Sequence, residues 1–313
     1  MQIVDRLLAG DRRALARLIS LVENGHPDGQ EAMRLLHSKT GRAKTVGITG
    51  PAGTGKSTLV NQLAKEFRAR GKTVGIVAVD PSSPFTRGAI LGDRIRMQDL
   101  VGDPDIFIRS MATRGSLGGL AETTTEVMSV LDAFGKDVVI VETVGAGQDE
   151  VEVIRATQTV VVIGTPGFGD DVQVMKAGIL EIADIFVVNK ADKEGANTLV
   201  SELNRLLSLS PGDGWKVPVL KTVAPDAQGI PELVDAIEAH WNHLKDSGRL
   251  EKGEEERVRH NLLTLTRQKL IQRLLEHNQK NGQLDALVKA VVAREIDPHS
   301  AAERLIANGE KTC

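Results

Sequence analysis

Residues 50–57 combine small residues with a lysine and a hydroxyl at a spacing that can bind phosphate. They read Gly-Pro-Ala-Gly-Thr-Gly-Lys-Ser, which matches the pattern G-x-x-x-x-G-K-[ST]. In this pattern the glycines let backbone N–H groups surround a phosphate, the lysine reaches the β- and γ-phosphates, and the hydroxyl ligates Mg²⁺. The sequence therefore predicts a nucleoside triphosphate site, with Lys56 as a catalytic charge and Ser57 as a metal ligand.

A second polar motif can select the base of that nucleotide. Residues 189–192 read Asn-Lys-Ala-Asp and follow the apolar run 185–188. An ionised carboxylate only accepts hydrogen bonds, so Asp192 can accept from both N1–H and the exocyclic amine of guanine. Adenine has no donors at those positions and would leave the carboxylate unpaired, which allows strong discrimination. We therefore expect guanine, with residues 222–224 as a backbone contact to its O6.

Carboxylates at two strand ends could complete a metal site. Mg²⁺ takes oxygen ligands in octahedral geometry. Asp80 and Glu142 each end an apolar run, and Asp93 lies in a polar stretch between them. Glu142 also begins Glu-Thr-Val-Gly, where many GTPases have Asp-x-x-Gly. We expect Ser57, Asp80, Asp93 and Glu142 around the metal and assign Glu142 a catalytic role.

One nucleotide would contact three regions: the loop at residues 50–58, Gly145, and the two segments at the base, residues 189–192 and 222–224. The N–H of Gly145 can bind the γ-phosphate. The expected set is Gly50, Pro51, Ala52, Gly53, Thr54, Gly55, Lys56, Ser57, Thr58, Gly145, Asn189, Lys190, Asp192, Thr222, Val223 and Ala224.

Apolar strands and helices alternate between about residues 45 and 244. The runs are mostly continuous rather than alternating, which is typical of strands buried on both faces of a parallel sheet. Ligands of such sheets bind beyond the carboxyl ends of the strands, where each polar motif falls. The expected strands are 45–49, 73–79, 106–109, 137–141, 159–163, 185–188 and 217–221.

Helical patterns flank this region. Apolar residues between 15 and 22 share one helix face, Asp11 can cap that helix, and a second helix is expected at about 30–37. Apolar residues between 258 and 274 predict a long amphipathic helix, and Asp297-Pro298 predicts the start of a last one. We divide the chain into a helical N-terminal extension (1–42), a nucleotide-binding α/β domain (43–246) and a helical C-terminal arm (247–313).

Composition limits the partners. The 313 residues carry a net charge of −3, so electrostatics do not favour nucleic acid or an anionic membrane, and no apolar run approaches a membrane span. The single cysteine, Cys313, excludes disulfides within the chain and cysteine-based metal sites, and we expect a cytoplasmic protein.

Longer motifs resemble the MeaB/ArgK family, the GTPases associated with methylmalonyl-CoA mutase and related adenosylcobalamin-dependent acyl-CoA mutases. The resemblance covers nearly the whole chain, with Ala146 and Asp149 where we expect Val and Ser. The matching motifs are residues 10–15, 79–84, 88–94, 117–119, 141–148 and 166–173, followed by Lys176, Gly178 and Glu181.

The resemblance implies a P-loop NTPase fold with a mostly parallel central sheet, and a homodimer to which the C-terminal arm contributes. It implies a GTP-hydrolysing chaperone that gates cofactor loading, or protects or reactivates the mutase. Residues 166–176 resemble a third switch loop that communicates with the partner, and Lys176 is a catalytic candidate there. We expect slow intrinsic turnover that a partner raises.

Three alternatives remain open at this stage. A nickel-insertion GTPase needs Cys or His ligands, and His240 and His243 are the only close histidine pair, which we interpret as a helix surface. A kinase of an amino-acid transport system needs an acceptor site and an adenine-compatible pocket, against which residues 189–192 argue. A signal-recognition-type GTPase needs a basic or Met-rich domain, which the six scattered methionines do not provide.

Overall fold

The computed structural model describes residues 2–80, 97–112, 119–143, 154–167, 182–208 and 214–310. The chain divides into two compact units, residues 1–254 and 255–313, which are treated separately below. No helix in the described ranges has the length and apolar content that a membrane crossing requires.

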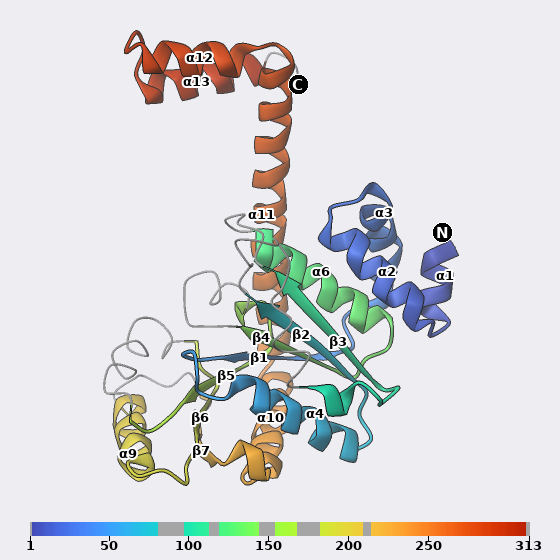
Figure 1. Cartoon of the computed structure of the whole chain (residues 1–313), viewed down its shortest axis with the longest axis vertical. Coiled ribbons are helices and arrows are strands. Elements are labelled where there is room, and N and C mark those ends of the chain that lie inside the picture. Colours follow the sequence, from blue (N-terminus) through green and yellow to red (C-terminus); the bar gives the residue numbers. More distant parts are fainter. Residues whose placement is uncertain are drawn as a thin grey trace. The chain divides into compact units, whose positions relative to one another are not determined.

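The first unit is built on a sheet of seven described strands, all parallel, in the order β3-β2-β4-β1-β5-β6-β7 (Figure 1). All seven expected strands are present, each within a few residues of its expected ends. Because β1 lies at the centre, the loop that follows it opens where the order of the strands reverses, which is the usual ligand position in such sheets. The strands are β1 Lys44–Thr49, β2 Val74–Asp80, β3 Ile106–Ala112, β4 Val138–Thr143, β5 Thr159–Gly164, β6 Ile185–Asn189 and β7 Val219–Thr222.

Helices cover both faces of the sheet. Helices α4 (Lys56–Ala69) and α10 (Ile230–Asp246) lie on one face, and α6 (Gly119–Ala133) lies on the other with the N-terminal helices (Figure 1). Successive strand residues point to opposite faces, so Val138 and Ile140 join the core of α4 while Val139 and Val141 join that of α6. Helix α9 (Ala196–Leu207) packs a third cluster on β5 and β6. This double burial explains the continuous apolar runs of the strands.

The N-terminal extension forms α1 (Gln2–Leu8), α2 (Arg12–Glu23) and α3 (Pro27–Leu36), and its apolar residues share a core with α6, β2 and β4. Asp11 caps α2 as expected, since its Oδ1 accepts from the backbone N–H groups of Arg13 (2.8 Å) and Ala14 (3.2 Å). Helix α3 begins three residues before the expected Gln30. Pro27 is tolerated there because the first turn of a helix needs no N–H from it.

The C-terminal part of the chain is helical, as expected, with α11 (Arg249–Lys280), α12 (Gln283–Val292) and α13 (Pro298–Glu310). Asp297 caps α13 through the N–H groups of His299 and Ser300. The expected single apolar face of α11 is wrong. At 100° per residue, positions 258, 262 and 265 lie on one side of the helix, and positions 263, 270 and 274 lie on another.

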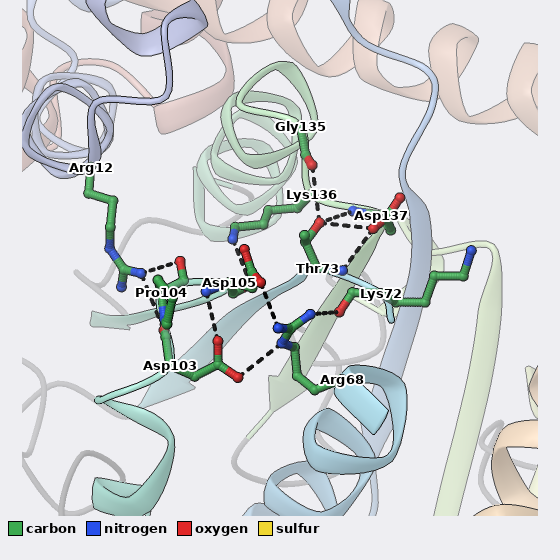
Figure 2. A network of polar contacts seen from close by, with 10 residues as sticks. All are labelled: Arg12, Arg68, Lys72, Thr73, Asp103, Pro104, Asp105, Gly135, Lys136 and Asp137. Atoms are coloured by element: carbon green, nitrogen blue, oxygen red, sulfur yellow. Dashed lines mark hydrogen bonds and ion pairs between the residues drawn. The ribbon is translucent and has the colours of Figure 1, made fainter. Parts of the chain in front are cut away.

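Figure 2 shows a polar network. It lies at the amino edge of the sheet, opposite the loop after β1, because Thr73, Asp105 and Asp137 each come directly before a strand. Arg68 of α4 contacts Asp103 (3.0 Å) and Asp105 (2.6 Å) in the connection before β3. Lys136 donates to the Asp105 carbonyl (2.7 Å), and Asp137 accepts from the Thr73 N–H (2.7 Å). The network therefore joins α4, the connection into β3, and the turn between α6 and β4.

Lys136 gives this network a pH dependence. Burial lowers the pKa of its ammonium from 10.5 to about 8, and the nearby Arg12 contributes to the shift. Between these values the unfolded chain binds more protons than the folded one, so the free energy of unfolding should rise with pH. We expect Lys136 to add at most about 3 kcal/mol to that rise. The rise should be smaller in Lys136→Met, measured by urea unfolding between pH 8 and 10.5.

The matched control is Lys39→Met, because Lys39 is exposed in the short helix η1 (His37–Lys39). It should keep the rise seen in the wild-type protein. An identical pH slope for Lys136→Met and wild type would contradict this account of the lysine.

Candidate nucleotide site

Residues 50–55 form the loop between β1 and α4, and its glycines are required by its backbone. Gly50 has φ 147° and Gly55 has φ 91°, both in the left-handed region that favours glycine. A Cβ on Gly50 would collide with the Ile163 carbonyl of β5. A Cβ on Gly55 would lie 2.5 Å from the Asn189 amide nitrogen. The loop is therefore enclosed by β5 on one side and by the end of β6 on the other.

Lys56 is the first residue of α4 and is 6% exposed. Its ammonium donates to the carbonyls of Gly50 (2.8 Å) and Pro51 (2.9 Å), so the side chain folds back over the loop. Backbone N–H groups at a helix start, together with a lysine over the loop, favour an anion. This geometry suits a phosphate group.

Ser57 and Glu142 lie next to each other in the interior. The Ser57 hydroxyl donates to Glu142 Oε1 at 2.6 Å, and the two residues are 6% and 4% exposed. The contact follows from the sheet, since Ile48 at the end of β1 pairs with Glu142 on β4. A hydroxyl and a carboxylate at this edge are the hard oxygen donors that Mg²⁺ prefers, so the pair fits that ion.

Asn189, at the end of β6, joins the phosphate loop to the region expected at the base. It is 1% exposed, and its amide nitrogen donates to the Thr54 carbonyl (2.8 Å). Its amide oxygen accepts from the Thr222 hydroxyl (3.0 Å) and the Ala224 N–H (3.2 Å). The structure thus brings together residues that are more than a hundred positions apart in the sequence.

The two charged residues of the same motif lie at the surface. Lys190 has φ 55° and donates to the Gly53 carbonyl at 2.7 Å, which adds a second link to the phosphate loop. Asp192 is exposed in the turn after β6, where its carboxylate can accept from a bound base. The sequence motif indicated base contacts, but it did not indicate that Asn189 and Lys190 support the loop.

The structure does not describe the contacts that four of the expected site residues would make in the site. Asp80 ends β2 at the same sheet edge as Glu142, since Val79 pairs with Thr143, and its side chain is not described. Asp93, Gly145 and Lys176 lie outside the described residues. Their roles remain predictions.

The interpretation of His240 as part of a helix surface is wrong. His240 is 2% exposed, and its Nδ1 lies 2.9 Å from the Thr159 hydroxyl while its Nε2 lies 3.3 Å from Asp184. Thr159 begins β5, so this contact is at the amino edge of the sheet, away from the phosphate loop. In the part of the chain that the structure describes, no three His, Cys, Asp or Glu side chains gather as a metal site.

The fold and the loop define the class of the protein: it is a P-loop NTPase. More narrowly, the chain belongs to the family described as "Methylmalonyl Co-A mutase-associated GTPase MeaB", whose model matches residues 15–279.

The names of similar proteins are consistent with membership of this family. A Pyrococcus abyssi protein, assigned to the GTPases by its name, is 50% identical over 97% of this chain and 95% of its own length. "GTPase ArgK" of Escherichia coli is 33% identical over 96% of this chain and 94% of its own. "Methylmalonic aciduria type A homolog, mitochondrial" of Caenorhabditis elegans is 31% identical over 96% and 80%.

A solved structure of similar fold is named "LAO/AO transport system kinase". It has a TM-score of 0.73 and 27% sequence identity, and the match covers 98% of this chain and 96% of that one.

Asp192→Asn should change the base preference. An amide presents a donor where guanine also has donors, whereas xanthine has a carbonyl at that position, so we expect GTP affinity to fall by about 100-fold and XTP to become the better ligand. Competition binding with GTP and XTP measures this.

Lys56→Ala is the matched control, because it removes a phosphate contact and leaves the base motif intact. It should weaken GTP and XTP alike. If Asp192→Asn still prefers GTP over XTP, the assignment of Asp192 to the base is wrong.

Proposed function

We propose that this protein is a GTP-dependent chaperone for an adenosylcobalamin-dependent acyl-CoA mutase such as methylmalonyl-CoA mutase. It would assist cofactor loading, or protect or reactivate the mutase. The observation that carries this proposal is the family match over residues 15–279, whose description names the mutase. The Caenorhabditis elegans relative, named for methylmalonic aciduria, supports the same direction.

The described residues support GTP binding and hydrolysis by position and charge. Phosphoryl transfer needs mainly positioning and stabilisation of the developing charge. Lys56 supplies a positive charge at the loop, and Asn189 aligns the loop with the base region. Ser57 and Glu142, with Asp80 and Asp93 as further candidates, would hold Mg²⁺, which supplies charge neutralisation at the phosphates when bound. Gly145 is the candidate for a backbone contact to the γ-phosphate, and Lys176 is the candidate for an additional positive charge when the partner is bound.

We propose that turnover is slow in the isolated protein and faster with the mutase present. In this proposal GTP acts as a conformational signal rather than as a phosphate donor to a metabolite. A partner that binds one nucleotide state more tightly than the other shifts the population of that state.

A kinase of an amino-acid transport system is the second candidate, because the solved structural relative carries such a name. It would transfer the γ-phosphate to an acceptor and need not prefer guanine. Residues 189–192 favour the GTPase over the kinase. Tighter binding of ATP than of GTP would instead favour the kinase.

The partner is tested by capture from an extract of the native cell. The purified protein, immobilised with a non-hydrolysable GTP analogue, should retain a cobalamin-dependent mutase, and retention should fall with Lys56→Ala, which binds the nucleotide poorly. Mass spectrometry identifies the retained proteins. Absence of any cobalamin mutase from the wild-type eluate would contradict the chaperone proposal while leaving the GTPase assignment unaffected.

We also propose a homodimer that uses the helical tail. Exposed large apolar side chains occur on α11 and on the helices that follow it, and exposed apolar surface of this kind indicates an interface. They are Val258, Leu262, Leu263, Leu270, Ile271, Leu275, Val288, Val292 and Ile306.

Light scattering should therefore give twice the chain mass of 33.7 kDa for the wild-type protein. Leu263 and Leu270 lie on one side of α11, so Leu263→Lys combined with Leu270→Lys should shift the mass toward one chain, because the interface would bury two new charges. Lys269→Glu, an exposed charge change on the same helix, is the control and should remain dimeric. An unchanged mass in the double variant would contradict a dimer through this side of the tail.

A further inference from the structure

Helix α4 carries a polar stripe that begins at the nucleotide site. Ser57, Asn61, Lys65 and Arg68 are spaced by four, four and three residues, so they lie on one side of the helix. Ser57 contacts Glu142 at the site itself. The other three contact a single segment of the chain, residues 97–106, which leads into β3.

Asp99 contacts Asn61 and Lys65, the two residues of the stripe that lie nearest to Ser57. It lies in the short helix η2 (Gln98–Leu100), where its carboxylate accepts from the Asn61 amide at 2.7 Å and forms an ion pair with Lys65. The hydrogen bonds from Lys65 and Asn61 lower the pKa of Asp99, so it is ionised at neutral pH. Asn61 is 7% exposed and lies one turn beyond Ser57. Asp99 thus restrains α4 one turn from the predicted metal ligand.

The segment is also fixed by apolar contacts. Met97, Leu100 and Ile106 are 0%, 3% and 2% exposed, and they belong to the same core cluster as Leu63 and Phe67 of α4. Closely packed cores transmit displacement rather than absorb it. A displacement of residues 97–106 would therefore displace α4 as well.

Arg12 of α2 contacts the same segment from the N-terminal helices (Figure 2). Its guanidinium donates to the carbonyls of Asp103 (3.3 Å), Pro104 (2.5 Å) and Ile106 (2.8 Å). Figure 2 shows Arg12 and Arg68 approaching the Asp103–Asp105 region from two different helices. The segment therefore joins the helix that carries Lys56 and Ser57 to the N-terminal extension.

We propose that Asp99 is a positioning residue for the phosphate-binding end of α4, and that Arg12 makes the N-terminal helices α1–α3 a regulatory unit of the nucleotide site through residues 97–106. Displacement of these helices by a bound protein would then change nucleotide affinity, and nucleotide binding would change the affinity for that protein by the same factor. The proposal rests on the assignment of Lys56 and Ser57 to the phosphate site.

The test is the dissociation constant of a fluorescent GDP with Mg²⁺, measured with thermal unfolding of the nucleotide-free protein. We expect Asp99→Ala to raise the dissociation constant by about tenfold and Arg12→Ala by about threefold. Asp99→Asn keeps an oxygen that can accept from Asn61 and loses only the ion pair with Lys65. It should therefore recover most of the affinity. The double variant should lose less affinity than the product of the two single effects, because both act through one segment.

Arg13→Ala is the matched control for Arg12. Arg13 is the next residue of α2, is exposed, and its side chain makes no hydrogen bond or ion pair among the described residues. It should leave both the affinity and the unfolding temperature unchanged.

Each outcome decides between positioning and simple packing. If Asp99→Ala and Arg12→Ala lower the unfolding temperature but leave the dissociation constant at the wild-type value, the two residues only stabilise the fold and the proposal is overturned. Equal nucleotide affinities for Arg12→Ala and Arg13→Ala would show that the N-terminal helices do not influence the nucleotide site. Lys56→Ala tests the phosphate site by itself. Unchanged nucleotide binding in that variant would refute the assignment of Lys56 to the phosphate site, and not the proposed effect of residues 97–106 on nucleotide affinity.

Discussion

The site depends on one buried amide. Asn189 donates to the carbonyl of Thr54 in the phosphate loop and accepts from Thr222 and Ala224 beyond β7. A buried amide that keeps its hydrogen bonds stabilises the fold, whereas one that loses them is costly. These hydrogen bonds therefore join the loop at residues 50–55 to residues 222–224. Gly55 is part of the same constraint, because a side chain there would occupy the space of this amide.

The central position of β1 explains why the chemistry gathers at one edge. Ser57 follows β1, Glu142 ends the neighbouring β4, and Asn189 ends β6, so parallel strands bring three distant residues to the same side. The opposite edge contains polar contacts that join the elements there, including the network of Arg68 and Lys136 and the buried His240. Ligands of open α/β sheets bind beyond the carboxyl ends of the strands, which is the edge where these three residues lie.

Much of the fold was predictable because strands buried on both faces have a strong pattern. Every residue of β4, β5 and β6 is buried, and each of these strands contains four consecutive apolar residues. Helix caps such as Asp11 and Asp297 were predictable for a local reason, because their capping hydrogen bonds join residues two or three positions apart. Helix α11 was predicted, but it extends beyond the pattern at residues 258–274 in both directions, and its apolar side chains do not lie on one face.

The sequence by itself determined the class of ligand, because the phosphate loop and the base motif are local patterns whose residue types carry their chemistry. It also determined the order of strands and helices along the chain. Only the tertiary structure decided that Asn189 joins residues 50–55 to residues 222–224 and that His240 is buried. It also decided that Arg12 contacts the segment 97–106, whose Asp99 contacts α4. These contacts join residues tens to more than a hundred positions apart. No local spacing encodes such pairs, because chain folding alone brings them within hydrogen-bonding distance.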